Sequence, residues 1–294
     1  MSDHPGTPAL PDFDALWDYP NPAESERRFR ELVPAAEASG DASYLAQLLS
    51  QIARAQCLLR RYDDADATLD RADALLTAES HLPRVRCLLE RGRIRNDQLQ
   101  GDRGRAVFLE AWEIGRRERI DNHAVDAAHM LGIIAPHAEA VEWNLRALEY
   151  ARQSPDPKAR RWAATLSNNL GWAYSAAGEH QKALDLFHEC GRLREEQGSR
   201  DGERIARWSI AKTLRLMGRV EEALAMQEAI AGMLQAAGES DGYGHEEMAE
   251  CLLALGRADE ARPHFAQAYE LLSKDPWFPP AEPDRLERMR RLGA

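Results

Sequence analysis

Residues 168–190 read NNLGWAYSAAGEHQKALDLFHEC, and they contain the pattern that decides the fold. Gly178 is placed to end one helix, because glycine readily takes the left-handed conformation in which helices commonly close. Gly171 precedes it by seven residues, and Ala183 follows it by five. Small side chains at these two positions let two helices approach closely where they cross. The stretch therefore predicts a pair of helices joined by a tight turn.

The same pattern recurs about six times along the chain. Alanines equivalent to Ala183 follow one another at intervals of 34 to 43 residues: Ala65, Ala106, Ala140, Ala183, Ala223 and Ala261. In four units a glycine stands five residues before the alanine: Gly101, Gly178, Gly218 and Gly256. In five units a small residue stands twelve residues before it: Ala53, Ala128, Gly171, Ala211 and Ala249. The unit around Ala106 has Ile94 at that place, and a register shifted to Gly92 fits about as well. One pair cannot bury its apolar stripe alone, so the repetition predicts a stack with a continuous core.

With these spacings the chain resembles the tetratricopeptide repeat family, most closely over residues 160–197. The resemblance implies an all-α fold, a right-handed superhelical solenoid of antiparallel helix pairs with about six repeats and flanking cap helices. We expect a mobile N-terminal segment over residues 1–20, an N-terminal helix or half-repeat over 21–40, and the solenoid over 41–275. Residues 276–294 are expected to form a proline-rich turn and a C-terminal capping helix. Pro34 is expected to bend the N-terminal helix or end it early.

Composition and charge limit the classes of function. The 294-residue chain has a formal net charge of −11, which disfavours non-specific nucleic-acid binding because phosphates would be repelled. It has no run of eighteen apolar residues and no N-terminal pattern of a secretory signal, so we expect no membrane span and a cytoplasmic location. Its four cysteines are scattered without a C-x-x-C pair, which favours buried thiols in a reducing compartment: Cys57, Cys87, Cys190 and Cys251.

No sequence pattern points to catalysis, a metal or a cofactor. His245-Glu246 begins like the zinc motif H-E-x-x-H, but Ala249 stands where the second histidine is required. The chain has neither a G-x-x-x-x-G-K-[ST] phosphate loop nor a G-x-S-x-G nucleophile turn. Paired acids such as Glu195-Glu196 are adjacent and point in different directions on a helix. The sequence therefore predicts a protein that is not an enzyme and that needs no cofactor.

The resemblance implies that the first helix of each pair lines a concave groove. Inward residues in the family lie three before, one after and four after the small residue. In this sequence these positions predict a basic groove with aromatic residues, for which the candidates are Arg54, Arg91, Arg95, His129, Asn168, Trp172, Trp208, Lys212 and Arg215. In the second repeat, the alternative register selects Leu89, Arg93 and Asn96 instead.

The residue types in this groove suit a peptide ligand. Arginine pairs with carboxylates through two hydrogen bonds, and tryptophan supplies a large anchoring area. An asparagine amide can bond to both the N–H and the C=O of an extended main chain, and in similar repeat proteins an asparagine at the place of Asn168 often does so. Two plainer interpretations stay open: the arginines could pair with acids of neighbouring repeats, and the tryptophans could pack between repeats.

These features favour a protein- or peptide-binding scaffold that holds an extended, acidic segment. Two alternatives stay open. One is a peptide-responsive intracellular regulator. It would act through a partner that supplies the effector domain, because the roughly 20 residues before the first helix are too short for one. The other is a self-assembling structural scaffold that pairs through apolar residues near the C-terminus: Trp277, Phe278, Leu286 and Met289. Neither nucleic acid nor a membrane is an expected partner, and the sequence does not determine the oligomeric state.

Overall fold

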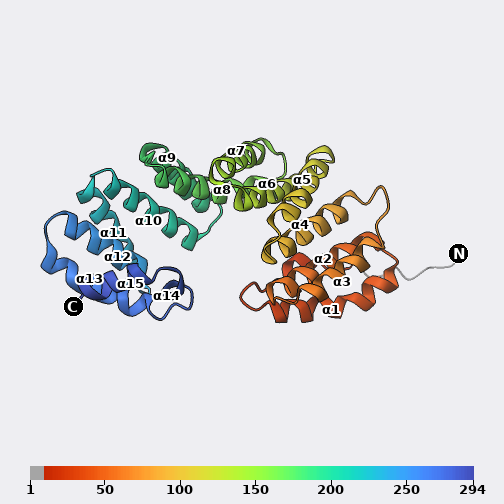
Figure 1. Cartoon of the computed structure of the whole chain (residues 1–294), viewed down its shortest axis with the longest axis horizontal. Helices are drawn as coiled ribbons and strands as arrows, with labels where there is room; N and C mark the ends of the chain where they lie inside the picture. The colour runs from red at the N-terminus through yellow and green to blue at the C-terminus, as the bar shows by residue number, and fades with distance from the viewer. Residues whose placement is uncertain (1–9) are drawn as a thin grey trace. The chain divides into compact units, whose positions relative to one another are not determined.

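A computed structural model describes residues 10–294 (Figure 1), which are helical and contain no strand. The elements are η1 (Phe13–Leu16), α1 (Pro22–Ser39), α2 (Ala42–Leu58), α3 (Tyr62–Asp73), α4 (His81–Asp97), α5 (Gly101–Arg117), α6 (Asp121–Ile134), α7 (His137–Gln153), α8 (Pro157–Ala176), α9 (His180–Glu196), α10 (Arg200–Leu216), α11 (Val220–Ala236), α12 (Gly242–Ala254), α13 (Ala258–Leu272), α14 (Phe278–Ala281) and α15 (Pro283–Leu292). Six consecutive pairs, from α2/α3 to α12/α13, correspond to the six predicted repeats. The prediction of an all-helical repeat fold is confirmed.

A small residue on the first helix and a large one on the second make the central contact of a repeat. A Cβ atom on Gly171 would lie 2.5 Å from the ring of Phe187, and one on Gly92 would lie 2.4 Å from the ring of Phe108. Both phenylalanines are fully buried. The two glycines therefore hold equivalent positions, since only a residue without Cβ leaves room for the ring.

This equivalence decides the register of the second repeat. Gly92 is its small residue, and Gly104, twelve residues later, takes the place that Ala183 holds in the fourth repeat. Gly104 is buried against the backbone of α4, whereas Ala106 is exposed. The assignment of Ala106 as the crossing residue is therefore wrong. Side chains two residues apart on a helix differ by about 200° in direction. Because Gly104 faces the partner helix, Ala106 points away from it.

Left-handed residues join the two helices in five of the six repeats. Backbone φ is positive at Arg60, Leu99, Gly178, Gly218 and Gly256. The predicted Gly101 is instead the first residue of α5, and Leu99 takes the left-handed place two residues earlier. In the third repeat Ala135 is extended, which suits the residue that precedes Pro136.

Replacing Leu99 by glycine is expected to raise the free energy of unfolding by about 1 kcal/mol, because a left-handed backbone costs a residue with a Cβ atom about 1–2 kcal/mol. The Leu99 side chain is 94% exposed, so little packing is lost. Ala106→Gly is the matched control at an exposed position inside α5, where glycine is expected to lower stability by about 1 kcal/mol. Urea denaturation measures both changes, and a Leu99→Gly protein less stable than the unmodified chain would contradict the expectation.

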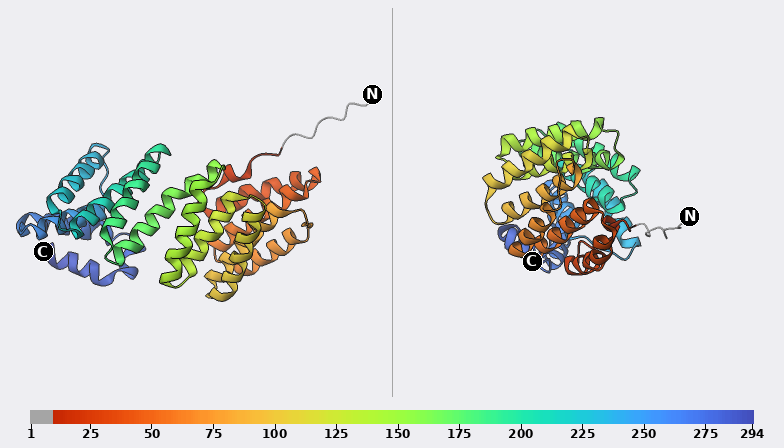
Figure 2. Two further views of the ribbon diagram at one scale, coloured as in Figure 1. Left: turned by 90° about the horizontal axis from the view of Figure 1, so that it is seen from above. Right: turned by 90° about the vertical axis from the view of Figure 1, so that its right-hand side faces the viewer.

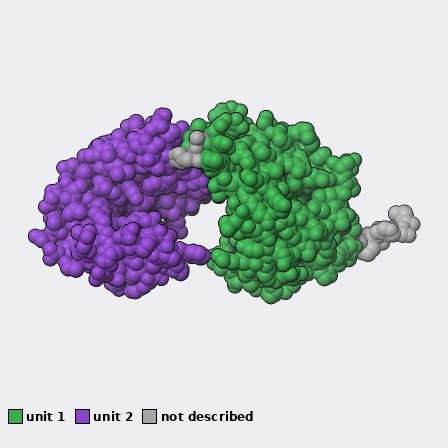
Figure 3. Space-filling model, in the orientation of Figure 1, with its two compact units in different colours: residues 1–162 green, residues 163–294 purple. Residues whose placement is uncertain are grey.

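The chain divides into two compact units, residues 1–162 and 163–294, and the division falls within α8 (Figure 3). Within each unit, neighbouring helices run antiparallel (Figure 2). The core of unit 1 includes Phe29, Leu48 and Ile52, all nearly inaccessible to solvent. The core of unit 2 includes the fully buried Phe187 and Phe265.

Residues 10–20 pack against unit 1. The Phe13 side chain is buried, and the indole N–H of Trp17 donates to Oε1 of Gln51 on α2 at 2.9 Å. These residues therefore differ from the predicted mobile segment, because aromatic anchors hold them on the repeats. Residues 1–9, which belong to the same prediction, lie outside the described part of the chain.

Helices flank the repeats at both ends, as expected. α1 continues through Pro34 to Ser39, so the proline does not end it early. α15 packs on α13 with Met289 fully buried. Gly293 allows the close approach of the two backbones, since a Cβ atom there would lie 2.5 Å from the amide nitrogen of Ala266. The four cysteines are buried, as the sequence interpretation expected.

Candidate functional site

A row of aromatic rings crosses the first helices of the last three repeats. The ring centroids of Trp172 on α8 and Trp208 on α10 are 5.6 Å apart, and those of Trp208 and Tyr243 on α12 are 6.1 Å apart. Tyr243 contacts Phe278 at a centroid distance of 5.6 Å. We call these four residues the aromatic row of unit 2. The sequence predicted its two tryptophans but missed Tyr243, which stands one helical turn before Glu246 on α12.

Lys212 lies on this row. Its ammonium is 5.5 Å from the ring centroid of Trp172 and 5.1 Å from that of Trp208, which are cation–π distances. Among the described residues, no carboxylate lies within ion-pair distance of Lys212. Burial lowers the pKa of Lys212 below its ordinary value, although the nearby carboxylates of Glu247 and Glu246 act in the opposite direction. The structure thus holds a partly buried cation between two rings.

The other predicted cation of the row, Arg215, is already neutralised. Its guanidinium donates to both carboxylate oxygens of Glu247 on α12, at 2.5 and 3.1 Å. Burial raises the pKa of the Glu247 carboxyl, and the charge of Arg215 opposes this effect. Arg215 therefore joins the fifth and sixth repeats, which is the plainer of its two interpretations.

The C-terminal helix covers the acidic face of the last repeat. Arg285 donates to both oxygens of Glu246, at 2.6 and 2.5 Å, and Arg288 pairs with Glu250. Arg285 also lies over the rings of Tyr243 and Phe278. The sequence reasoning did not find this contact. The available signal was the match between the arginines of residues 284–292 and the two acids that stand three before and one after Ala249, Glu246 and Glu250.

Asn168 stands one helical turn before Trp172 on α8. Its Oδ1 atom is buried and has no hydrogen-bond partner among the described residues. An unpaired buried amide oxygen is costly, so such an atom is suited to accept a hydrogen bond from a ligand. Asn168, Trp172 and Lys212 therefore form a compact set within unit 2.

Unit 1 does not show the predicted arginine groove. Arg91 pairs with Asp70 and Asp73 at 2.6 Å, and Arg95 pairs with Asp66 at 2.7 Å. All three acids lie on α3, so these two arginines face the preceding helix. This placement follows from the register set by Gly92, in which the inward residue is Arg93.

Arg93 lies at the centre of a buried ion-pair network. Its guanidinium contacts Glu90 at 2.6 Å and both oxygens of Asp126, at 2.6 and 2.7 Å. Burial opposes the ionisation of Asp126, but the charge of Arg93 outweighs it and holds the pKa of that carboxyl below its ordinary value. Arg54 lies 3.8 Å from Glu90. A cavity of about 300 Å³ adjoins this network, and residues 14, 17 and 19 of the N-terminal segment line part of it.

His129 packs against Trp162 at a ring-centroid distance of 5.3 Å. Burial lowers the pKa of its imidazole, so it is held in its neutral form. Of the nine predicted groove residues, the structure brings together Asn168, Trp172, Trp208, Lys212 and Arg215. It places Arg54, Arg91, Arg95 and His129 in contacts within unit 1.

Among the side chains that the structure describes, no three metal-ligating groups lie together in a way suited to hold an ion. No helix in the described part of the chain is long and apolar enough to cross a membrane.

Comparison with known proteins agrees with this architecture. Residues 136–196 match the family model described as tetratricopeptide repeat. Among curated proteins, none matches the sequence.

Solved structures share the fold at low sequence identity. The apo form of the quorum sensor NprR from B. thuringiensis is 15% identical, with a TM-score of 0.62 over 95% of this chain and 78% of that one. The STAND protein PH0952 from Pyrococcus horikoshii, which has a tetratricopeptide repeat sensor, is 15% identical with a TM-score of 0.60 over 92% and 47%. Kinesin light chain repeats from Podosopora anserina are 18% identical with a TM-score of 0.53 over 65% and 95%. Residues 136–196 thus belong to the tetratricopeptide repeat family, and the described chain has the fold of tetratricopeptide repeat proteins.

Proposed function

We propose that this chain is a peptide-binding protein whose aromatic row in unit 2 holds an extended segment with an acidic side chain. The observation that carries the proposal is Lys212, a cation that lies over two tryptophan rings without a carboxylate partner among the described residues. A charge that is partly removed from water is stabilised by a counter-charge. A peptide carboxylate would supply one and would bring apolar atoms of its side chain against the rings.

The surrounding residues suit an extended main chain. The unpaired Oδ1 of Asn168 would accept a hydrogen bond from a peptide N–H, and its Nδ2 would donate to a peptide C=O. Trp172 and Trp208 offer broad, partly exposed rings that lose little conformational entropy on binding. Such aromatic anchors contribute most of the binding energy in many interfaces.

The preference for acidic peptides rests on Lys212 alone. Arg215 is occupied by Glu247, and the arginines of α15 are occupied by Glu246 and Glu250. These pairs add little net charge to the row, so we expect selectivity for one carboxylate at a defined position rather than for a highly acidic segment.

A relative with the same fold supports a peptide ligand. NprR has been solved in complex with its cognate peptide NprX, and that chain is 16% identical with a TM-score of 0.52 over 95% of this chain and 80% of its own. Binding, rather than catalysis, is the role that the aromatic row fits. Self-assembly through the C-terminus is less well supported, because Phe278 and Met289 are buried in their own unit and Leu286 is half-buried. Of the four apolar residues near the C-terminus, Trp277 alone is exposed.

Replacing Lys212 by methionine is expected to lower the affinity of the chain for a selected acidic peptide about 10- to 100-fold. The reason is that hydrogen bonds to charged groups contribute about 1.5–3 kcal/mol. The peptide is first selected from a random-sequence display library on the unmodified chain, and its affinity is then measured by calorimetry. We expect the selected sequences to share an aspartate or glutamate and to bind more weakly as salt is raised.

Lys182→Met provides the matched control. Lys182 also lies over an aromatic ring, that of Tyr174 at 5.1 Å, but it is paired with Glu179. Its replacement is expected to leave peptide affinity unchanged. Selected peptides without an acidic residue, or equal affinities for the Lys212→Met protein and the unmodified chain, would refute the proposed role of Lys212.

A further inference from the structure

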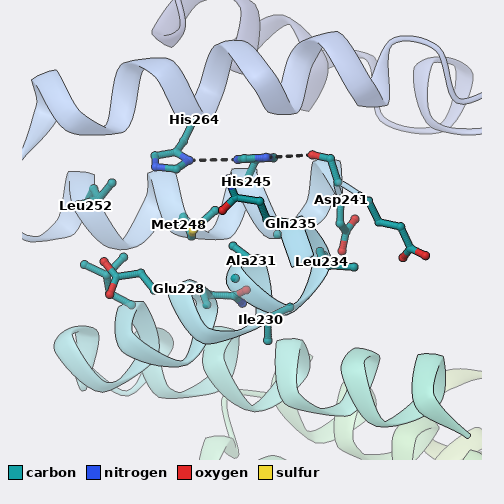
Figure 4. Close-up of a pocket in the computed structure, with 16 residues that line it drawn as sticks. Glu228, Ile230, Ala231, Leu234, Gln235, Asp241, His245, Met248, Leu252 and His264 are labelled. Atoms are coloured by element: carbon teal, nitrogen blue, oxygen red, sulfur yellow. Dashed lines mark hydrogen bonds between the residues drawn. The ribbon is translucent and has the colours of Figure 1, made fainter. Parts of the chain in front are cut away.

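A cavity of about 570 Å³ in unit 2 lies between α11 and α12, with His264 of α13 at its edge (Figure 4). Its volume is in the range of sites that bind small molecules. Most of the accessible surface of its wall is apolar, and the apolar side chains that line it are Leu224, Ile230, Ala231, Leu234, Met248 and Leu252. The cavity can therefore hold a largely apolar ligand of moderate size.

This cavity is separate from the aromatic row because the two use different faces of α12. His245, Met248 and Leu252 line the cavity, and their spacing of three and four residues places them on one face of the helix. Glu246 and Glu250 lie on another face, where they pair with α15. A ligand in the cavity would thus leave the aromatic row uncovered.

Gln227 is the unusual residue in the cavity wall. It stands four residues after the crossing residue Ala223, a place that phenylalanine fills in the second, fourth and sixth repeats as Phe108, Phe187 and Phe265. Those three phenylalanines are fully buried core residues. Gln227 is equally buried, at 1% exposure, but it carries an amide into the same environment.

The amide of Gln227 lacks partners for both of its polar atoms. Neither Oε1 nor Nε2 has a hydrogen-bond partner among the described residues. Buried polar atoms of this kind are rare because each unmade hydrogen bond is costly. Gln227 therefore brings one unpaired acceptor and one unpaired donor to the wall of the cavity.

The charges around the cavity disfavour an anionic ligand. Three carboxylates, Glu228, Glu239 and Asp241, are among its lining residues, which include neither lysine nor arginine. The Nδ1 atoms of His245 and His264 are 3.1 Å apart, so protonation of one ring opposes protonation of the other. Burial lowers the pKa of both imidazoles. A neutral ligand fits these surroundings better than a carboxylate or a phosphate.

We propose that this cavity binds a neutral, largely apolar small molecule with a cis-amide edge, such as a lactam or a cyclic dipeptide. A cis amide presents its N–H and C=O on the same side, so both can pair with Oε1 and Nε2 of Gln227 at once. A trans amide points the two groups in opposite directions and can satisfy only one of these atoms. This small-molecule site does not depend on peptide binding by the aromatic row.

The first test uses the cyclic dipeptide cyclo(Leu-Phe) as the probe and calorimetry on the full chain as the measurement. We expect saturable binding with one ligand per chain. The N,N′-dimethyl derivative keeps the apolar groups but lacks both N–H donors. Its affinity is expected to be at least about tenfold lower than that of cyclo(Leu-Phe). Failure of cyclo(Leu-Phe) to bind up to millimolar concentration, or equal binding of the two compounds, would overturn the proposal.

The second test replaces Gln227 by leucine, which has a similar volume and no polar atoms. We expect the probe's affinity to fall about tenfold or more while the Tm of the ligand-free chain rises by about 2–4 °C, since the unpaired amide is removed. Gln181→Leu is the matched control at an exposed position on α9, outside the cavity, and it is expected to change neither quantity. A lower Tm or an unchanged affinity in the Gln227→Leu protein would also overturn the proposal.

Discussion

Replacing Arg93 by methionine is expected to lower the free energy of unfolding by about 3–5 kcal/mol, because the change leaves two buried carboxylates without their counter-charge. Glu90 is 5% exposed, and the side chain of Asp126 is 15% exposed. Methionine nearly preserves the length and the apolar stem of arginine, so the loss reports the missing charge rather than a large cavity. Urea denaturation at pH 7 measures the difference.

The pH dependence of this effect has a defined sign. Arg93 holds the folded-state pKa of Asp126 below the ordinary value, so Asp126 contributes stability above its unfolded pKa and loses that contribution as the pH falls. Without Arg93, burial remains and raises the folded-state pKa. The Arg93→Met protein then gains stability relative to the unmodified chain as the pH falls from 7 toward 4, and the difference between them shrinks.

Two further variants check this interpretation. Arg93→Met combined with Asp126→Asn removes one of the stranded charges and is expected to recover part of the loss. Arg103→Met replaces an exposed arginine on α5 and is expected to change stability by less than about 0.5 kcal/mol. A stability difference for Arg93→Met that stays constant between pH 7 and pH 4 would be inconsistent with the buried-charge account.

Replacing Phe187 by alanine is expected to cost about 3–5 kcal/mol, the usual range for removal of a buried phenylalanine. The ring is fully buried, lies against Gly171, and contacts Trp172 at a centroid distance of 5.0 Å. Its loss opens a cavity in the centre of the fourth repeat and removes the support of the aromatic row. Thermal denaturation measures the stability, and peptide affinity is expected to fall as well.

A double variant tests the contact itself. Gly171→Ala alone is expected to cost about 1–3 kcal/mol, because its Cβ atom would lie 2.5 Å from the ring of Phe187. In the Phe187→Ala background that clash is absent, and alanine is the better helix former by about 1 kcal/mol. The same substitution should therefore stabilise the Phe187→Ala protein. Additive losses in the double variant would show that the two residues do not share this space.

Parts of the candidate site could be inferred from sequence because they depend on spacing along one helix. The interval of four residues places Asn168 and Trp172 on one face of α8, and the same interval links Trp208 to Lys212 on α10. The unpaired amide of Gln227 could have been suspected from the phenylalanines at equivalent places. No local pattern could show that its two polar atoms lack partners, since that depends on every neighbouring helix.

By itself the sequence determined that this chain folds as six helix pairs, because apolar periodicity, small crossing residues and left-handed turns act over one repeat at a time. Only the tertiary structure decided which cations are available to a ligand. Arg215 pairs with Glu247, which is 32 residues away in sequence, and Arg285 pairs with Glu246, which is 39 residues away. Such pairs form when the stacking of repeats brings separate helices together. The energy of a buried charge depends on the distance to its counter-charge and on its removal from solvent. Lys212 lies over two tryptophan rings of the same row and has no carboxylate at ion-pair distance among the described residues, which the order of its amino acids could not reveal.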